Sequence, residues 1–127
     1  MQTSYLFYIG IGGFLGAISR FLISWGVTNS FGNSLPFGTL SVNVIGGFII
    51  GGLFIYFEQN VAPEYKAILI TGFLGSLTTF STFSLETTML IQQSHYIKAA
   101  LNIFLNVFLS VGATILAMII FKKYYLS

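Results

Sequence analysis

Four apolar stretches, each long enough to cross a lipid bilayer, constrain this chain more than any other feature of its sequence. They span roughly residues 4–27, 36–57, 64–92 and 96–121. The hydrocarbon core of a bilayer is about 30 Å thick and takes about 20 helical residues to cross. Four crossings therefore leave only short loops and tails of the 127 residues. We predict an all-α membrane protein with four transmembrane helices in a single transmembrane domain, 1–127.

The charge content agrees with this fold class and excludes several kinds of function. Only 6% of the residues are charged, whereas about a quarter are charged in soluble globular proteins. No basic cluster exceeds the pair Lys122–Lys123, so we predict no nucleic-acid partner. The chain has no cysteine, which excludes disulfides and thiolate metal sites. No nucleophile has a histidine or carboxylate partner in the sequence, so we expect no enzymatic activity.

The middle of the third stretch is unlike the other three. Between Gly72 and Ser84 it is rich in glycine and in hydroxyl side chains, which compete with the backbone for helical hydrogen bonds. We predict that the third helix is broken at the membrane midplane. Backbone carbonyls that a break frees are tolerated there only if they are buried or coordinating, and carbonyl oxygen suits a hard cation such as Na⁺.

The same stretch also carries an aromatic stripe. Phe80, Phe83 and Glu86 recur every three residues and so share one helical face. Such a stripe is usually packing, but the positive edge of an aromatic ring can attract an anion without holding it tightly, which conduction requires. Glu86 has two interpretations: a group at a pore mouth, or a side chain that simply faces water near the end of the helix.

Five further polar residues lie inside the apolar stretches. Asn43 follows Thr39 by one helical turn, and its amide is either an interhelical hydrogen-bonding group, which the residue alone favours, or a donor that lines a path. Ser110 and Thr114 repeat this spacing in the fourth stretch, although hydroxyls in membrane helices usually bond their own backbone. Arg20 is either an interfacial anchor or a charge in a wet vestibule.

The basic residues give a weak orientation signal. With the N-terminus in the cytoplasm, Lys66, Lys122 and Lys123 lie on the cytoplasmic side, and Lys98 and Arg20 lie toward the other side. Basic loop residues set the orientation of membrane proteins, and this bias is too small to do so firmly. Insertion in both orientations, giving an antiparallel dual-topology homodimer, and a single weakly set orientation both remain open.

Three motifs are distributed along the chain: Gly12-x3-Gly16-Ala17-x2-Arg20, Gly38-Thr39-Leu40-x-Val42-Asn43-x2-Gly46, and Gly72-x2-Gly75-x2-Thr78-Thr79-Phe80-Ser81-Thr82-Phe83-Ser84-x-Glu86. With these motifs the chain resembles, over nearly its whole length, the small bacterial fluoride channels of the Fluc, or CrcB, family. The third is the most specific, because glycine spacings alone are common in transmembrane helices. One departure is visible: family members often carry a second glycine where this chain has Ser76.

This resemblance implies a channel in the inner (plasma) membrane of the cell that conducts fluoride passively and lowers its cytoplasmic concentration. It implies an antiparallel homodimer with two pores and one structural Na⁺ at its centre, held by the carbonyls of Gly75 and Thr78. Arg20 would then be a vestibule charge. The resemblance and the hydroxyl track beside the rings predict a fluoride pore lined by Asn43, Phe80, Phe83, Ser110, Thr114, Thr39, Ser81 and Thr82.

The main alternative is a proton-coupled exporter of the small multidrug type, which also has four helices. Such an exporter needs an acidic residue inside the first helix, and this chain has only Arg20 there. Glu86 lies too near the end of its helix to replace that residue comfortably.

Overall fold

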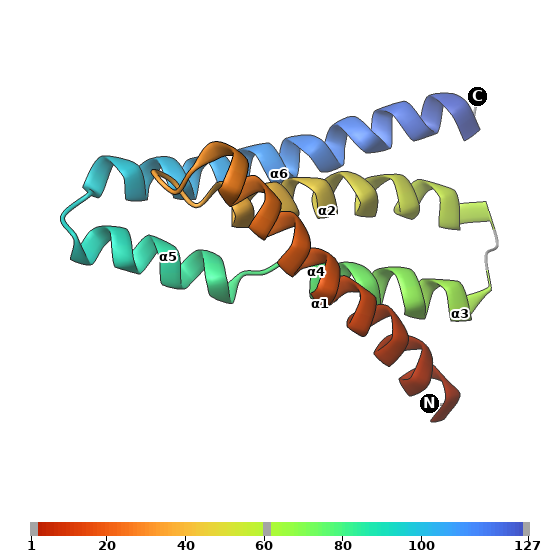
Figure 1. The fold of residues 1–127 in the computed structure, drawn as a ribbon. Coiled ribbons are helices and arrows are strands. Elements are labelled where there is room, and N and C mark those ends of the chain that lie inside the picture. The colour runs from red at the N-terminus through yellow and green to blue at the C-terminus, as the bar shows by residue number, and fades with distance from the viewer. Residues whose placement is uncertain (1–2, 60–61, 126–127) are drawn as a thin grey trace.

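The computed structural model describes residues 3–59 and 62–125. They contain four helical spans long and apolar enough to cross a membrane, as expected of a four-span membrane protein. Three spans are single helices, and the third is composed of several shorter elements (Figure 1). The spans are α1 (Thr3–Phe31), α2 (Phe37–Tyr56), the composite span Pro63–Gln92, and α6 (Tyr96–Tyr125).

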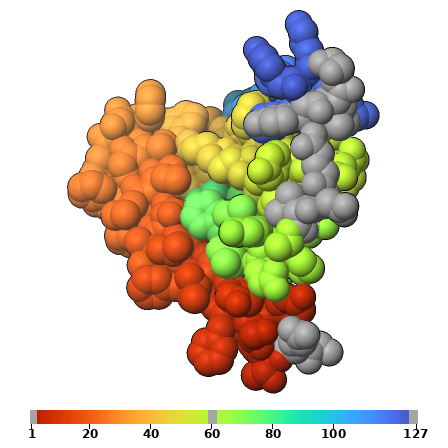
Figure 2. Space-filling view, turned by 90° about the vertical axis from the view of Figure 1, so that its right-hand side faces the viewer, coloured from red at the N-terminus to blue at the C-terminus, as the bar shows by residue number. Residues whose placement is uncertain are grey.

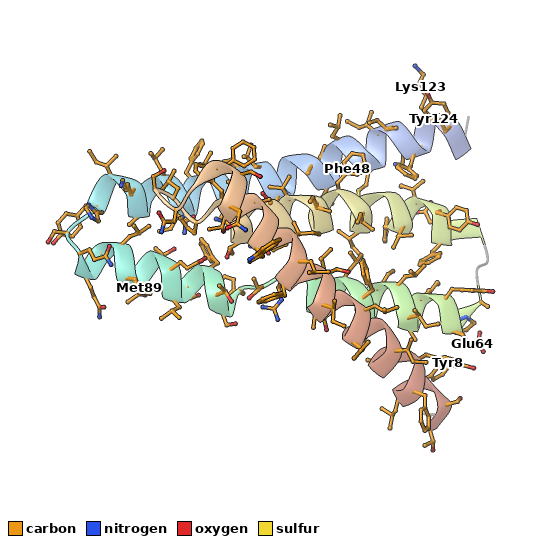
Figure 3. All side chains as sticks on the ribbon, in the orientation of Figure 1. Tyr8, Phe48, Glu64, Met89, Lys123 and Tyr124 are labelled. Atoms are coloured by element: carbon orange, nitrogen blue, oxygen red, sulfur yellow. The ribbon has the colours of Figure 1, made fainter. Side chains whose placement is uncertain are left out.

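The spans pack as two pairs. α2 lies along α6, and α1 crosses the first half of the composite span. Both ends of the described chain lie at the same end of the bundle (Figure 1), as an even number of spans requires. Seen from that end, α1 and the end of α6 lie at opposite edges of the molecule (Figure 2). The polar side chains of Glu64, Lys123 and Tyr124 also lie at this end (Figure 3), where a membrane surface would solvate them.

The composite span is interrupted near its middle. It comprises α3 (Pro63–Lys66), a π-helix η2 (Ala67–Leu74), α4 (Gly75–Leu77) and α5 (Ser81–Gln92). Thr78 ends α4 in an extended conformation, with φ −84° and ψ 157°. The Thr79 hydroxyl then accepts a hydrogen bond of 3.2 Å from the Thr82 N–H, which satisfies one of the free donors at the start of α5.

The π-helix is an element that the sequence did not predict. It lies against α1, where glycines bring the two backbones into contact. A Cβ added at Gly12 would collide with the Ile68 carbonyl oxygen, and one added at Gly16 with the Phe73 carbonyl oxygen. On α2, a Cβ at Gly47 would lie 2.8 Å from the Ser110 carbonyl oxygen. At these positions the absence of a side chain lets the helices pack closely, as small residues do between membrane helices.

Two helices run past their predicted ends. α1 continues to Phe31, not Val27, because the exposed Thr28, Asn29 and Ser30 stay in its last turn. Gly32 ends it with φ 81° and an N–H bond of 2.9 Å to the Thr28 carbonyl, the left-handed cap that glycine favours. α6 continues to Tyr125, not Phe121, because lysine and tyrosine are compatible with a helical last turn.

Much of the outer surface is apolar. Phe7 and Ile97 are 72% and 78% exposed, whereas the central core cluster consists of only Val42, Leu74 and Leu77 with a few partly buried neighbours. Soluble monomers rarely expose large continuous apolar surfaces. This surface fits a hydrocarbon environment.

Candidate functional site

An open groove of about 440 Å³ lies where α2, α6 and the interrupted span meet. We refer to it as the central groove. It collects residues that are far apart in the sequence and that include six of the predicted site positions. These six are Asn43, Gly75, Thr78, Phe80, Phe83 and Ser110.

The two phenylalanines form an edge-to-face pair at the groove. Their ring centroids are 5.5 Å apart and their planes meet at 62°. Phe80, in the interruption, is 77% exposed, and Phe83 on α5 is partly buried. In such a pair the positive edge of one ring faces the π-face of the other. The remaining edges of the two rings are not used in this contact.

Asn43 binds the backbone of the interruption. Its Oδ1 accepts a hydrogen bond of 2.8 Å from the Thr79 N–H. Its Nδ2 donates to the Thr79 carbonyl at 3.2 Å and to Asn106 Oδ1 at 2.9 Å. An amide nitrogen has two hydrogens, and both are used. A fluoride ion that accepted a hydrogen bond from Asn43 would have to replace one of these partners.

Ser110 is the group in the groove with an unused donor. Its Oγ is buried and has no hydrogen-bond partner in the described part of the chain. A buried hydroxyl without a partner costs about 1–3 kcal/mol, so such a group needs an explanation. A ligand that accepts a hydrogen bond in the groove would supply one.

The other predicted pore hydroxyls do not line the central groove. Thr114 Oγ1 donates to the Gly47 carbonyl at 2.7 Å, where it joins α6 to α2. Ser81 and Thr82 form the first turn of α5, and Thr39 is buried on α2. Their assignment to a pore stays a prediction.

Thr39 belongs instead to a second cavity of about 440 Å³, which lies between the first loop and the end of α5. The Thr39 side chain lies beside the Glu86 carboxylate there. Glu86 Oε1 is buried without a hydrogen-bond partner within residues 3–59 and 62–125. This oxygen is therefore shielded from solvent, and both interpretations of Glu86, as a group at a pore mouth or as a side chain that faces water, stay predictions. The polar residues of the lining are Ser24, Thr28, Asn33, Ser34, Thr39, Glu86 and Gln93.

Arg20 lies at the interruption. Its Nε donates a hydrogen bond of 3.0 Å to the Ser76 carbonyl, in the last turn of α4. A cation is favourable at a helix C-terminus, where free carbonyls carry partial negative charge. Arg20 does not line the cavity that holds Glu86, and its role as a vestibule charge stays a prediction.

Most of the carbonyls at the interruption have donors. Leu74 accepts from Thr78, Ser76 from Arg20, and Thr79 from Asn43. No described residue donates a hydrogen bond to the carbonyl of Gly75 or Thr78. Both residues line the central groove. The residues present therefore fit a hard cation bound by carbonyl oxygen.

Three buried polar residues complete the site and have no role in the sequence-based prediction. Thr87, Asn102 and Asn106 are 7%, 2% and 5% exposed. They are hydrogen-bonded to one another and, through Asn106, to Asn43. The signal in the sequence was the pair Asn102 and Asn106, one turn apart in an otherwise apolar helix.

Known proteins are similar to this chain over nearly its whole length. Three similar proteins carry the name fluoride-specific ion channel FluC. The protein from a Nitratiruptor species is 58% identical over 125 residues, covering 98% of both chains. That from a Sulfurovum species is 56% identical over 125 residues, covering 98% of this chain and 99% of its own length. That from Campylobacter jejuni is 50% identical over 118 residues, covering 92% of this chain and 97% of its own length.

The family described as CrcB-like protein, Camphor Resistance (CrcB), matches residues 7–118. This range includes most of all four spans, the interruption and every residue of the central groove. The chain therefore belongs to the CrcB-like family.

Proposed function

We propose that this protein is a fluoride-selective ion channel of the plasma membrane, which passively exports fluoride and lowers its cytoplasmic concentration. Its relatives named as fluoride-specific channels match it over nearly their full length, and the four apolar spans agree with a multi-pass membrane protein. The observation that carries the proposal is the buried Ser110 hydroxyl in the groove of Phe80 and Phe83, which has no hydrogen-bond partner among the described residues. The protein is a channel and not an enzyme.

The chemistry of the groove suits fluoride in particular. Fluoride is small and strongly hydrated, so a selective pore must replace its water with several short-range donors. The Ser110 hydroxyl and the ring edges of Phe80 and Phe83 are candidates for this lining, with Thr39, Ser81, Thr82 and Thr114 as further hydroxyls along the path. None of these groups carries a fixed positive charge, so each holds the ion weakly enough to release it.

We propose further that two copies form an antiparallel, dual-topology homodimer with two pores. In a single copy the central groove is open on one side, and Phe80 is 77% exposed in it. A second copy across a two-fold axis would close the groove. The small difference in basic residues between the two sides is compatible with insertion in both directions.

One Na⁺ ion at the dimer centre completes the proposal. The carbonyls of Gly75 and Thr78, which have no donor in the described structure, would hold it. One copy offers two oxygens and a two-fold pair offers four. The ion would supply positive charge that stabilises the break and the dimer contact. We propose that the broken span lies with this site at the membrane midplane.

The proton-coupled exporter is not favoured. Such a transporter requires an acidic group in the first span, and α1 has none. The relatives that match nearly the whole chain are named as channels.

Efflux from liposomes tests the proposed function. We expect liposomes that contain only this protein to release fluoride rapidly and to release chloride at the rate of protein-free liposomes. Larger halides gain less from short donors and should not fit the lining. Equal fluoride and chloride rates would contradict selectivity, and no fluoride release above the protein-free control would contradict conduction.

A second arm of this assay tests the cation. Protein purified and reconstituted without Na⁺, with a large organic cation in its place, should conduct more slowly or lose its dimer in size-exclusion chromatography. Unchanged rates and an unchanged elution volume would remove Na⁺ from the proposal without affecting the fluoride result.

Dual topology predicts two populations of C-termini. A reporter fused after Ser127 should give signal from both sides of the membrane, because the weak basic bias does not select one orientation. A fusion in which two added lysines strengthen the bias should shift the signal to one side. Signal from one side only in the unmodified fusion would exclude the antiparallel dimer.

A further inference from the structure

A continuous chain of side-chain hydrogen bonds leads away from the groove through the protein interior. It starts at Asn43, whose Nδ2 donates to Asn106 Oδ1 at 2.9 Å. Asn106 Nδ2 donates to Asn102 Oδ1 at 3.1 Å and to the Asn102 carbonyl at 2.9 Å. Asn102 Nδ2 donates to Thr87 Oγ1 at 2.9 Å, and Thr87 Oγ1 donates to the Phe83 carbonyl at 2.8 Å.

The chain has a single direction. Every member accepts from the residue before it and donates to the next, until the last hydrogen bond reaches the backbone of Phe83. Both amide hydrogens of Asn106 are donated to Asn102, so the Asn106 side chain presents its oxygen, Oδ1, to Asn43. An oxygen can only accept, so Asn43 must present its nitrogen to Asn106. The Asn43 oxygen is then directed at the Thr79 N–H.

The two ends of the chain both lie at residues that line the central groove. One end is the Thr79 peptide in the interruption, and the other is the backbone of Phe83, whose ring lines the groove. The middle members are buried, with Asn102 only 2% exposed. An amide buried there without partners would be costly, so the network is stable only when complete.

We propose that Thr87, Asn102 and Asn106 are positioning residues. They fix the orientation of the Asn43 amide, and through it the Thr79 peptide and the broken span, without themselves binding the ion. This inference rests on the proposed function for its conduction test. The orientation of Asn43 is a separate property of the folded protein and is measured separately.

Thr87 gives the sharpest test, because α5 supplies a matched control one residue away. Thr87 and Thr88 each donate to the carbonyl four residues earlier, at 2.8 and 2.9 Å. Only Thr87 also accepts from Asn102. Thr87→Val and Thr88→Val thus remove the same local bond, but only Thr87→Val ends the chain.

We expect Thr87→Val to slow fluoride efflux about fivefold, the size of one hydrogen bond between membrane helices. Thr88→Val should conduct at the wild-type rate. In ¹⁵N-labelled protein, Thr87→Val should also shift the side-chain amide signals of Asn43, which it does not contact, and Thr88→Val should leave them in place. These signals are assigned by their loss in Asn43→Ser.

Two results would overturn the proposal. One is equal efflux in the two valine variants with unmoved Asn43 signals. The other is slow efflux in Thr87→Val with unmoved Asn43 signals, which would make the role of Thr87 local.

If Thr87→Val does not elute with the wild type, Thr87→Ser and Thr87→Ala replace it. Both are smaller than threonine, and only serine keeps the hydroxyl, so serine should retain the wild-type Asn43 signals and alanine should not. Wild-type protein that fails to conduct would contradict the proposed function and leave the Asn43 measurement intact.

Discussion

Gly12→Ala should prevent α1 from packing against the π-helix, and we expect it to be the most damaging single substitution considered. A Cβ at this position would collide with the Ile68 carbonyl oxygen and lie 2.9 Å from the Phe73 backbone nitrogen. Backbone atoms cannot move aside as a side-chain end can, so the helices would have to separate. Overpacking of this kind costs about 3 kcal/mol. The loss would appear as a lower melting temperature, followed by the fluorescence of Trp25, the single tryptophan, which lies on α1.

Gly10→Ala is the matched control for this prediction. It lies two residues earlier on the same helix, and a Cβ there would meet no atom within 4 Å. Alanine has a higher helix propensity than glycine by about 1 kcal/mol, so this variant should melt at or above the wild-type temperature. If both variants melted with the wild type, the close contact between α1 and η2 would be wrong.

Phe80→Ile should slow fluoride efflux about hundredfold, which corresponds to about 2.7 kcal/mol. Isoleucine keeps an apolar side chain of similar volume but has no ring quadrupole, so it offers fluoride no positive edge. Electrostatic contacts are strengthened in a narrow path from which water is excluded, and Phe80 is the most exposed aromatic residue of the central groove. Phe83→Ile should act in the same direction, because its ring completes the pair. Efflux from liposomes measures both, and size-exclusion chromatography checks that the assembly is unchanged.

Phe108→Ile separates the ring chemistry from the general loss of an aromatic residue. Phe108 is 60% exposed on α6, stacks on Phe104 with centroids 4.5 Å apart, and does not line the central groove. Its replacement should leave efflux at the wild-type rate. Wild-type efflux in both Phe80→Ile and Phe83→Ile would exclude the proposed role of the ring edges.

The candidate site was only partly predictable. Asn43, Phe80, Phe83 and Ser110 stood out because each is conspicuous within its own helix, and the structure brings all four to one groove. What each one does there was not predictable, since it depends on partners from other spans. The Asn43 amide is saturated by Thr79 and by Asn106, which lie 36 and 63 positions away.

Other features had no local signal at all. The π-helix Ala67–Leu74 resembles an ordinary apolar segment in sequence. Its close contact with the glycines of α1 is seen only in the folded structure. The depth of Arg20 in the membrane left two interpretations open. The structure adds a hydrogen-bond partner that neither interpretation named, the carbonyl of Ser76, which lies 56 positions later. A hydropathy profile cannot predict such a pairing, because it averages over consecutive residues, whereas the donor and the acceptor lie on separate helices.

The sequence by itself determined the four spans and the unusual character of the third. Hydrophobicity and the competition between glycine, hydroxyls and the helical backbone act over a few consecutive residues, so a linear analysis captures them. The tertiary structure decided which polar groups are paired and which are left for a ligand. Hydrogen bonds form between whichever groups the packed helices bring within about 3 Å. Only the fold gives Asn43 three hydrogen bonds and leaves the Ser110 hydroxyl without a partner in residues 3–59 and 62–125.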